Sequence, residues 1–259
     1  MIALLKTAER ANNNSFINNY VFQRHLFAYK EIPNEYLRHK NVLELGCGEG
    51  YGMESVAPEA NFYLAVDKKK PSHDRFPANT SFQKCKLPQL TKIADQSFDT
   101  VICFQVIEHI KDDHRLLLEI RRVLRPGGYL LLTTPNRCMS LTRNPFHIRE
   151  YLPEEIETLI AEYFRTSQVE GIYGNRRVMS YYEENRRSVR MFERLDVFRL
   201  RERLPLPLLR ILYTLFNNIN RYLLLRKVED LTGEINFDDF YRHRLSQECL
   251  DYFITAGKS

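Results

Sequence analysis

Residues 41–52, NVLELGCGEGYG, are the stretch on which the predicted fold of this 259-residue chain depends. The apolar run 41–45 contains one acid, Glu44, and leads into glycines at alternate positions from Gly46 to Gly52. A buried strand that enters a glycine-rich turn and then a helix lets backbone N–H groups approach a ligand closely. Open α/β sheets hold nucleotides in this way at the carboxyl ends of their strands. The stretch therefore predicts a nucleotide-type site.

The glycine spacing indicates which ligand the turn accepts. A dinucleotide fold requires G-x-G-x-x-G, but here the third position falls on Tyr51 and the glycine comes one residue early, at Gly50. Glu44 places a carboxylate where a pyrophosphate would be repelled and an ammonium attracted. The E-x-G-x-G-x-G pattern resembles motif I of the class I S-adenosylmethionine (SAM) dependent methyltransferases with a type-11-like domain. A nicotinamide-dependent dehydrogenase is disfavoured for the same reasons.

The resemblance implies a set of cofactor contacts around this turn. In the family the acid lies near the methionine amine of SAM, and the glycines admit its amino-acid and ribose portions. The implied contacts are Glu44, Gly46, Cys47, Gly48 and Gly50.

Three further strands are predicted to end near the same ligand. Asp67 follows the strand 61–66, where an acid can accept hydrogen bonds from both ribose hydroxyls; the alternative is a turn aspartate. Lys86 and Leu87 follow the strand 81–85, where the family often has Asp or Asn, so we expect backbone and apolar contacts to adenine. The strand 100–104 and the loop QVIEH resemble the family's fourth strand and loop, with Gln105 acting through its backbone.

The QVIEH loop contains two residues of a known metal-binding pattern. Methyltransferases of small-RNA 3′ ends bind a divalent ion with E-x-x-E-H and a distant histidine, whereas this chain has Gln105, Glu108, His109 and His147. A neutral amide is a poor ligand for a hard cation, and metal-free relatives also carry the E-H pair, where it caps the helix and orients the loop. We expect SAM as the cofactor and no metal.

The polar loop 134–151 and the N-terminal helix supply the remaining candidates. Polar residues on the ligand edge of a sheet are natural substrate contacts. His147 is the candidate general base, because imidazole titrates near neutral pH; alternatively it hydrogen-bonds the loop into place. Arg24 lies in a helix with Phe22, Leu26 and Tyr29 at helical spacing, and it either covers the cofactor or faces solvent. The candidate substrate contacts are Asn136, Arg143, Arg149 and Tyr151.

The complete pattern predicts an α/β, Rossmann-like fold. Its seven-stranded, mostly parallel sheet would carry helices on both faces and a helical insertion before the last strand. The amphipathic segment 113–124 and the segment 153–164 are expected helices, and 129–133, 167–173 and 249–256 the remaining strands. The predicted division is a helical lid at 1–39, a core at 40–174 plus 245–259, and the insertion at 175–244.

The insertion is strongly basic. Residues 176–227 contain thirteen basic and five acidic residues, a difference of +8, which exceeds the +5 of the whole chain. An amphipathic helix usually buries its apolar stripe in its own protein, which favours a lid packed on the core. A dimer interface and an anionic membrane surface remain alternatives.

Composition restricts the class of protein. The chain is 44% hydrophobic and 27% charged, and its five cysteines form no C-x-x-C pair, as in a reduced cytoplasmic protein. Lys6, Glu9 and Arg10 interrupt the apolar start, so we expect no signal peptide. No uninterrupted apolar stretch is long enough for a membrane span.

Together these features predict a SAM-dependent methyltransferase that releases S-adenosylhomocysteine. The acceptor is expected to be a hydroxyl of a small molecule, sugar or lipid precursor. The alternatives are a metal-assisted RNA ribose 2′-O-methyltransferase and a non-catalytic SAM-binding protein. We expect a small-molecule substrate, no nucleic-acid partner, and a monomer or homodimer.

Overall fold

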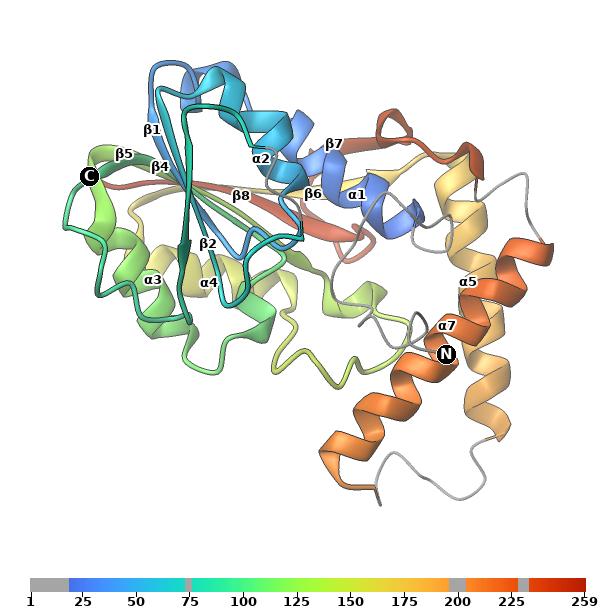
Figure 1. The fold of residues 1–259 in the computed structure, drawn as a ribbon. Coiled ribbons are helices and arrows are strands. Elements are labelled where there is room, and N and C mark those ends of the chain that lie inside the picture. Colours follow the sequence, from blue (N-terminus) through green and yellow to red (C-terminus); the bar gives the residue numbers. More distant parts are fainter. Residues whose placement is uncertain (1–18, 73–75, 196–203, 228–232) are drawn as a thin grey trace. The chain divides into compact units, whose positions relative to one another are not determined.

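The computed structural model describes residues 19–72, 76–195, 204–227 and 233–259, and the chain forms two compact units (Figure 1). The core unit comprises His25–Met139, Ile148–Tyr173 and Arg242–Ser259. The insertion unit comprises Met1–Arg24, Ser140–His147 and Gly174–Tyr241. The predicted lid 1–39 is thus divided between the units, and its first eighteen residues lie outside the described ranges.

The sheet has eight strands in the order β3-β2-β1-β4-β5-β8-β6-β7. Strands β1 to β5 run parallel to one another, and β8 is antiparallel to both β5 and β6. The strands are β1 (Asn41–Leu45), β2 (Phe62–Asp67), β3 (Thr80–Lys84), β4 (Phe98–Phe104), β5 (Leu124–Pro135), β6 (Thr166–Gly174), β7 (Phe240–Arg244) and β8 (Asp251–Gly257). The predicted Rossmann-like class is confirmed.

The predicted number of strands is wrong by one, because β7 falls in the segment that was expected to be helical. Its sequence, FYRHR, carries three basic side chains, and four of its five residues are at least partly exposed. Short, charged strands are typical of sheet edges, where they discourage pairing with other chains. Such a strand lacks the apolar alternation by which a strand is predicted.

In the described ranges, six α-helices accompany the sheet: α1 (Asn19–Lys30), α2 (Tyr51–Val56), α3 (Asp113–Val123), α4 (Pro153–Tyr163), α5 (Arg176–Leu195) and α7 (Leu206–Lys227). In the core unit, α2 lies on one face of the sheet and α3 and α4 lie on the other (Figure 1). Helix α3 is capped by Asp112, whose carboxylate accepts from the N–H of Arg115 at 2.9 Å. Helix α4 begins at Pro153, and Glu155 accepts from the N–H of Leu152 at 2.8 Å, as the L-P-E-E sequence predicts.

The position of the site follows from the chain order of the central strands. Residues 42–45 of β1 and 100–104 of β4 are buried, as expected for parallel strands with helices on both faces. From the β1–β4 pair the chain proceeds outward in both directions, to β2 and β3 on one side and to β5 on the other. Ligands of open α/β sheets bind where the strand order reverses, beyond the carboxyl ends of the strands. In this chain that place is the end of β1 and β4.

In the insertion unit, α5 and α7 are joined by hydrogen bonds among two amides and a hydroxyl. Asn220 donates to Asn185 at 2.8 Å and accepts a hydrogen bond from Ser188. Segments 196–203 and 228–232 of the predicted insertion lie outside the described residues. Among the described helices, none combines the length and the apolar character needed to cross a membrane.

Candidate active site

The glycine turn after β1 is held by its backbone. Gly46, Gly48 and Gly50 have φ of 73°, 58° and 86°, a region that L-residues with a Cβ rarely adopt. The N–H of Gly46 donates to the carbonyl of Val66 at 2.7 Å. A Cβ at Gly46 would lie 2.5 Å from Cγ2 of Val106, whereas a Cβ at Gly48 would meet no atom of the described chain within 4 Å. Gly46 is therefore required by packing, and Gly48 leaves open space beside the turn.

Glu44 is a fully buried carboxyl group at the end of β1. Its Oε1 accepts from the hydroxyl of Tyr29 at 2.6 Å, while the buried Oε2 makes no hydrogen bond of ordinary length within the described part of the chain. Burial raises the pKa of Glu44 to about 7, although the Tyr29 and Tyr63 hydroxyls lower it. A carboxyl group held at this pKa favours a cationic ligand, because a nearby positive charge stabilises its ionised form.

The fourth glycine of the motif belongs to this arrangement. A Cβ at Gly52 would lie 2.4 Å from the ring of Tyr29 and 2.7 Å from Oε1 of Glu44. Gly52 therefore lets α1 bring its tyrosine onto the buried acid. Burial and the charge of Glu44 raise the pKa of Tyr29 well above its usual value, so the hydroxyl stays a donor.

Asp67, the last residue of β2, connects two turns at the ligand edge. Its Oδ2 accepts from the N–H of Gly48 at 3.0 Å, and its Oδ1 accepts from the N–H of Lys69 at 3.0 Å. In the β2–β3 register Asp67 lies opposite Lys84. The predicted adenine-side residues Lys86 and Leu87 follow two and three positions later, Lys86 being exposed and Leu87 packed against the core. The structure thus places these residues along one edge of the sheet.

Gln105 follows β4 with a backbone conformation that is unusual for a residue other than glycine. Its φ is 54°, and its N–H donates to the carbonyl of Thr133 on β5 at 2.9 Å. Positive φ at residues with a Cβ costs free energy and concentrates at functional sites. The next residue, Val106, is the one that contacts the glycine turn at Gly46. The β1 and β4 loops therefore contact each other, as the sequence predicts for a site at the switch point.

Glu108 is buried and linked to neighbouring elements. Thr134 on β5 donates to its Oε2 at 3.1 Å, and its main-chain carbonyl accepts from the N–H of Ile148 at 2.7 Å. Oε1 lies 3.9 Å from Nε2 of His109. These contacts agree with the interpretation that Glu108 orients the loop. His147, the third potential metal ligand, belongs to the insertion unit, and the expectation that no metal binds stays a prediction.

Two of the predicted substrate residues are fully engaged within the core unit. The Asn136 side chain donates to the carbonyls of Gln247 and Cys249 at 3.0 and 2.7 Å and accepts from Tyr252 at 2.6 Å. The buried hydroxyl of Tyr151 donates to Asp113 at 2.8 Å. Both side chains join strands and loops to each other, so their predicted contact with substrate gains no support.

The remaining substrate and cofactor candidates are more exposed or belong to the insertion unit. Arg149 forms an ion pair with Asp113 at 2.5 Å while half of its side chain stays exposed. Arg143 is exposed. The guanidinium of Arg24 lies 5.4 Å from the centre of the Tyr20 ring, and Nε2 of His147 lies 2.9 Å from Nδ2 of Asn144. Their predicted roles stay predictions.

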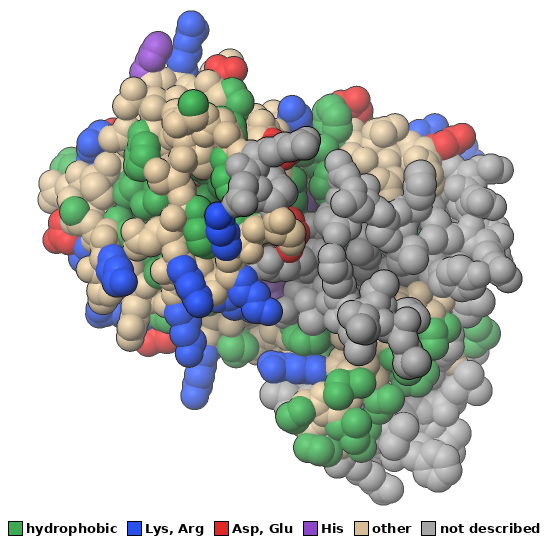
Figure 2. Space-filling view, viewed as in Figure 1, with side chains coloured by type: hydrophobic (Ala, Val, Ile, Leu, Met, Phe, Trp, Pro, Cys, Tyr) green, Lys and Arg blue, Asp and Glu red, His purple; other side chains and the backbone are tan. Residues whose placement is uncertain are grey.

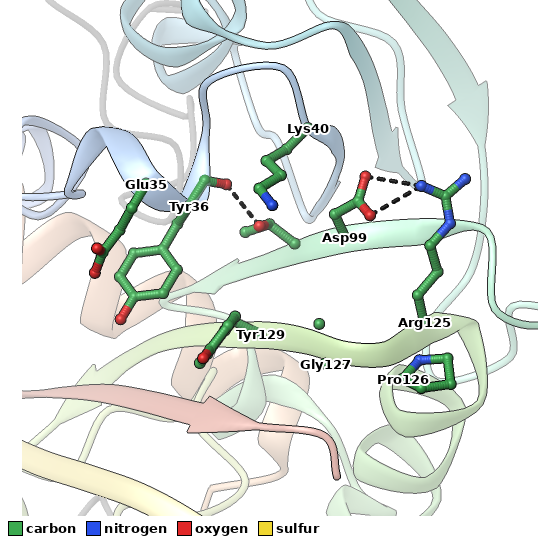
Figure 3. A pocket seen from close by; sticks show the side chains of 10 residues that line it. Glu35, Tyr36, Lys40, Asp99, Arg125, Pro126, Gly127 and Tyr129 are labelled. Atoms are coloured by element: carbon green, nitrogen blue, oxygen red, sulfur yellow. Dashed lines mark hydrogen bonds and ion pairs between the residues drawn. The ribbon is translucent and has the colours of Figure 1, made fainter.

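A cavity of about 370 Å³ lies at the opposite, amino edge of the sheet (Figure 3). Lys40 precedes β1 there, and the rings of Tyr36 and Tyr129 pack edge to face with centres 4.9 Å apart. Arg125 also lines the cavity, and its guanidinium donates to both carboxylate oxygens of Asp99 at 2.9 Å. The chemistry-bearing residues at the carboxyl edge do not line this cavity, so it is not the predicted cofactor site.

Comparison with known proteins finds similarity to methyltransferases. Residues 43–132 match the family described as a methyltransferase domain. The chain is 36% identical over 168 residues to a probable S-adenosylmethionine-dependent methyltransferase of Mycobacterium tuberculosis, covering 61% of this chain and 60% of the relative. It is 32% identical over 108 residues to a ubiquinone biosynthesis O-methyltransferase of Coxiella burnetii, covering 39% of this chain and 46% of the relative. The chain thus spans about three fifths of the mycobacterial relative's length.

Solved structures confirm the fold. A SAM-dependent methyltransferase from Archaeoglobus fulgidus aligns with a TM-score of 0.57 at 17% identity, covering 94% of this chain and 98% of that one. The open α/β sheet of this chain is therefore the fold of that solved structure. The chain resembles these methyltransferases through residues 43–132, which match the methyltransferase domain.

Tyr29 and Tyr63 are the contributors to the site that the sequence did not reveal. Tyr29 was predicted only as part of an apolar helix face, and Tyr63 only as part of a strand. Both lower the pKa of Glu44. The sequence did contain one sign that Tyr29 packs against Glu44. Gly52 continues the glycine alternation beyond the E-x-G-x-G-x-G pattern, and a Cβ there would meet Tyr29 and Glu44.

Proposed function

We propose that the protein is an enzyme that transfers the methyl group of SAM to a hydroxyl of a small molecule, sugar or lipid precursor. The methyl carbon would leave the sulfonium sulfur for the acceptor oxygen, the acceptor proton would pass to a base, and S-adenosylhomocysteine would remain. The observation that carries the proposal is the convergence of Glu44, the Gly46–Gly50 turn, Asp67 and Gln105 at the switch point.

The core residues fit a cationic nucleoside cofactor. Glu44 supplies buried negative charge, Gly48 leaves room for a close approach, and Asp67 supplies a carboxylate at the end of β2. SAM, when bound, supplies an electrophilic methyl group. Holding the acceptor in line with that group accounts for much of the rate in such a transfer.

His147 is the proposed general base. Its Nε2 lies 2.9 Å from the amide nitrogen of Asn144, so acting as a base at Nε2 requires the acceptor hydroxyl to replace that amide. The hydroxyl acceptor is supported by the likeness to the ubiquinone biosynthesis O-methyltransferase. It rests on that likeness alone.

Calorimetric titration with S-adenosylhomocysteine is the first test. We expect saturable binding to the wild type, weaker binding to Asp67→Ala, and unchanged binding to Asp95→Ala, whose carboxylate is 72% exposed. NADH should not bind. Absence of S-adenosylhomocysteine binding in folded protein would contradict the proposal at its first step.

Turnover is measured next, as S-adenosylhomocysteine released from SAM with hydroxyl-bearing acceptors, with and without EDTA. Turnover that persists in EDTA and falls in His147→Ala without loss of cofactor affinity agrees with the proposal. Loss of turnover in EDTA would favour the metal-assisted alternative, and binding without turnover on any acceptor class would favour the non-catalytic one.

A further inference from the structure

Helix α7 presents an apolar side to solvent. Leu208, Ile211, Leu215 and Ile219 are 41%, 55%, 45% and 39% exposed. They recur every three or four residues, so they lie along one side of the helix. Figure 2 shows hydrophobic side chains gathered at the surface where Figure 1 draws the first half of α7. Soluble proteins rarely leave a continuous apolar strip uncovered unless something binds it.

The other side of α7 faces the insertion unit. Thr214 and Asn220 are buried, and Asn220 makes the hydrogen bonds to α5 described above. Arg210 donates to the carbonyl of Pro145 at 3.2 Å and lies 5.3 Å from the centre of the Phe146 ring. The helix is therefore anchored through its polar side, and the apolar strip is the side left outward.

The charge of the helix decides between the partners that such a strip could have. The 22 residues of α7 include four basic residues and no acid. Since residues 176–227 carry +8 and the whole chain +5, the remainder of the chain carries −3. Two copies paired through this face would bring together two helices that each carry four basic residues and no acid, which opposes association. An anionic surface is attracted instead, by roughly 1 kcal/mol for each basic residue near it.

We propose that α7 docks on an anionic lipid bilayer, with its apolar side in the headgroup–acyl boundary. An apolar side together with basic residues and no acids is the composition of helices that lie in this interface. The docking belongs to the insertion unit and does not depend on the identity of the methyl acceptor.

Vesicle flotation of the full chain tests the proposal. Vesicles of phosphatidylcholine alone are compared with vesicles that also contain phosphatidylglycerol. We expect flotation with the anionic vesicles, weakened by salt, and at least roughly tenfold weaker partitioning of the double variant Ile211→Glu/Leu215→Glu. The matched control is Leu118→Glu, because Leu118 is 46% exposed on α3 of the core unit, and it should float like the wild type.

Folding is checked separately by thermal unfolding and by S-adenosylhomocysteine binding, with Ile219→Glu as a second variant if the double variant does not fold. Failure of the wild type to float with anionic vesicles would overturn the proposal. So would equal flotation of wild type and folded variants. A wild-type homodimer in light scattering that the same variants dissociate would show that a second copy covers this face.

Discussion

Replacing Glu44 with glutamine separates the cost of a buried carboxyl group from its use in binding. The folded-state pKa of Glu44 is about 7 against a model-peptide value of 4.5. At about 1.4 kcal/mol for each pH unit, that difference corresponds to roughly 3 kcal/mol by which the ionised carboxylate destabilises the cofactor-free protein above pH 7. The penalty shrinks as the pH falls from 7 and is absent below about 4.5, where the group is protonated in both states.

We therefore expect Glu44→Gln to raise the free energy of unfolding at pH 8 by up to about 3 kcal/mol. Glutamine keeps an acceptor for the Tyr29 hydroxyl, so the hydrogen bond at 2.6 Å can survive. The same variant should bind SAM more weakly, because the negative charge that favours the cationic cofactor is gone. In the wild type, SAM affinity should fall by up to about tenfold per pH unit as the pH drops below 7, and the variant should lose this dependence.

Urea denaturation between pH 5 and 8 and SAM titration between pH 5.5 and 7.5 measure the two effects. Glu119 is the matched control, because it is also buried but its pKa is lowered, chiefly by the hydrogen bond from Arg122. Glu119→Gln should destabilise the protein throughout pH 5 to 8, because the stabilisation from a lowered carboxyl pKa is lost only when the pH falls below the unfolded-state value of about 4.5. An unchanged or lower stability of Glu44→Gln at pH 8, in the presence of a normal Glu119→Gln result, would refute the reasoning.

Two further substitutions test the packing of the core unit by urea denaturation. Gly46→Ala should lower the free energy of unfolding by about 2–4 kcal/mol and abolish S-adenosylhomocysteine binding, because its Cβ would meet Val106 at 2.5 Å and its φ is 73°. The control Gly127→Ala, with φ of 74° and open space, should lower it by only about 1–2 kcal/mol. Equal losses for the two variants would contradict the steric argument. Asn136→Ala should cost about 2–4 kcal/mol, because it leaves buried carbonyls and the Tyr252 hydroxyl without their partner, and a cost below about 0.5 kcal/mol would mean that water replaces the amide.

The parts of this protein that could be predicted from sequence are those fixed by local backbone requirements. The alternating glycines require positive φ, which the structure has at Gly46, Gly48 and Gly50. The capping sequence at Pro153 and the apolar periods of the strands act within a few residues, so their structural result is encoded locally. The placement of Asp67 and Gln105 follows from the same logic, because parallel strands bring their carboxyl ends to one edge.

The parts that could not be predicted depend on pairs of side chains far apart in sequence. Asn136 was expected at the substrate because it is polar and follows a strand, but its amide is satisfied by residues 111 and 113 positions away. Tyr151 follows the same pattern with Asp113. A polar residue on the ligand edge can serve either the ligand or the fold, and only the three-dimensional partners distinguish the two.

Three buried acids of the core unit, Asp113, Glu119 and Glu44, show how this distinction is made physically. Asp113 and Glu119 are paired with arginines, Arg149 and Arg122, at 2.5 and 2.8 Å, so their charges are compensated within the protein. Within the described residues, Glu44 is hydrogen-bonded by the neutral hydroxyl of Tyr29 and paired with no cation, which leaves its negative charge uncompensated there. A buried carboxylate without a cation destabilises the fold, and a chain that retains one at the switch point gains from it only when a cationic ligand binds. The missing arginine at Glu44 is therefore stronger evidence for a cationic cofactor at this place than the presence of the acid alone.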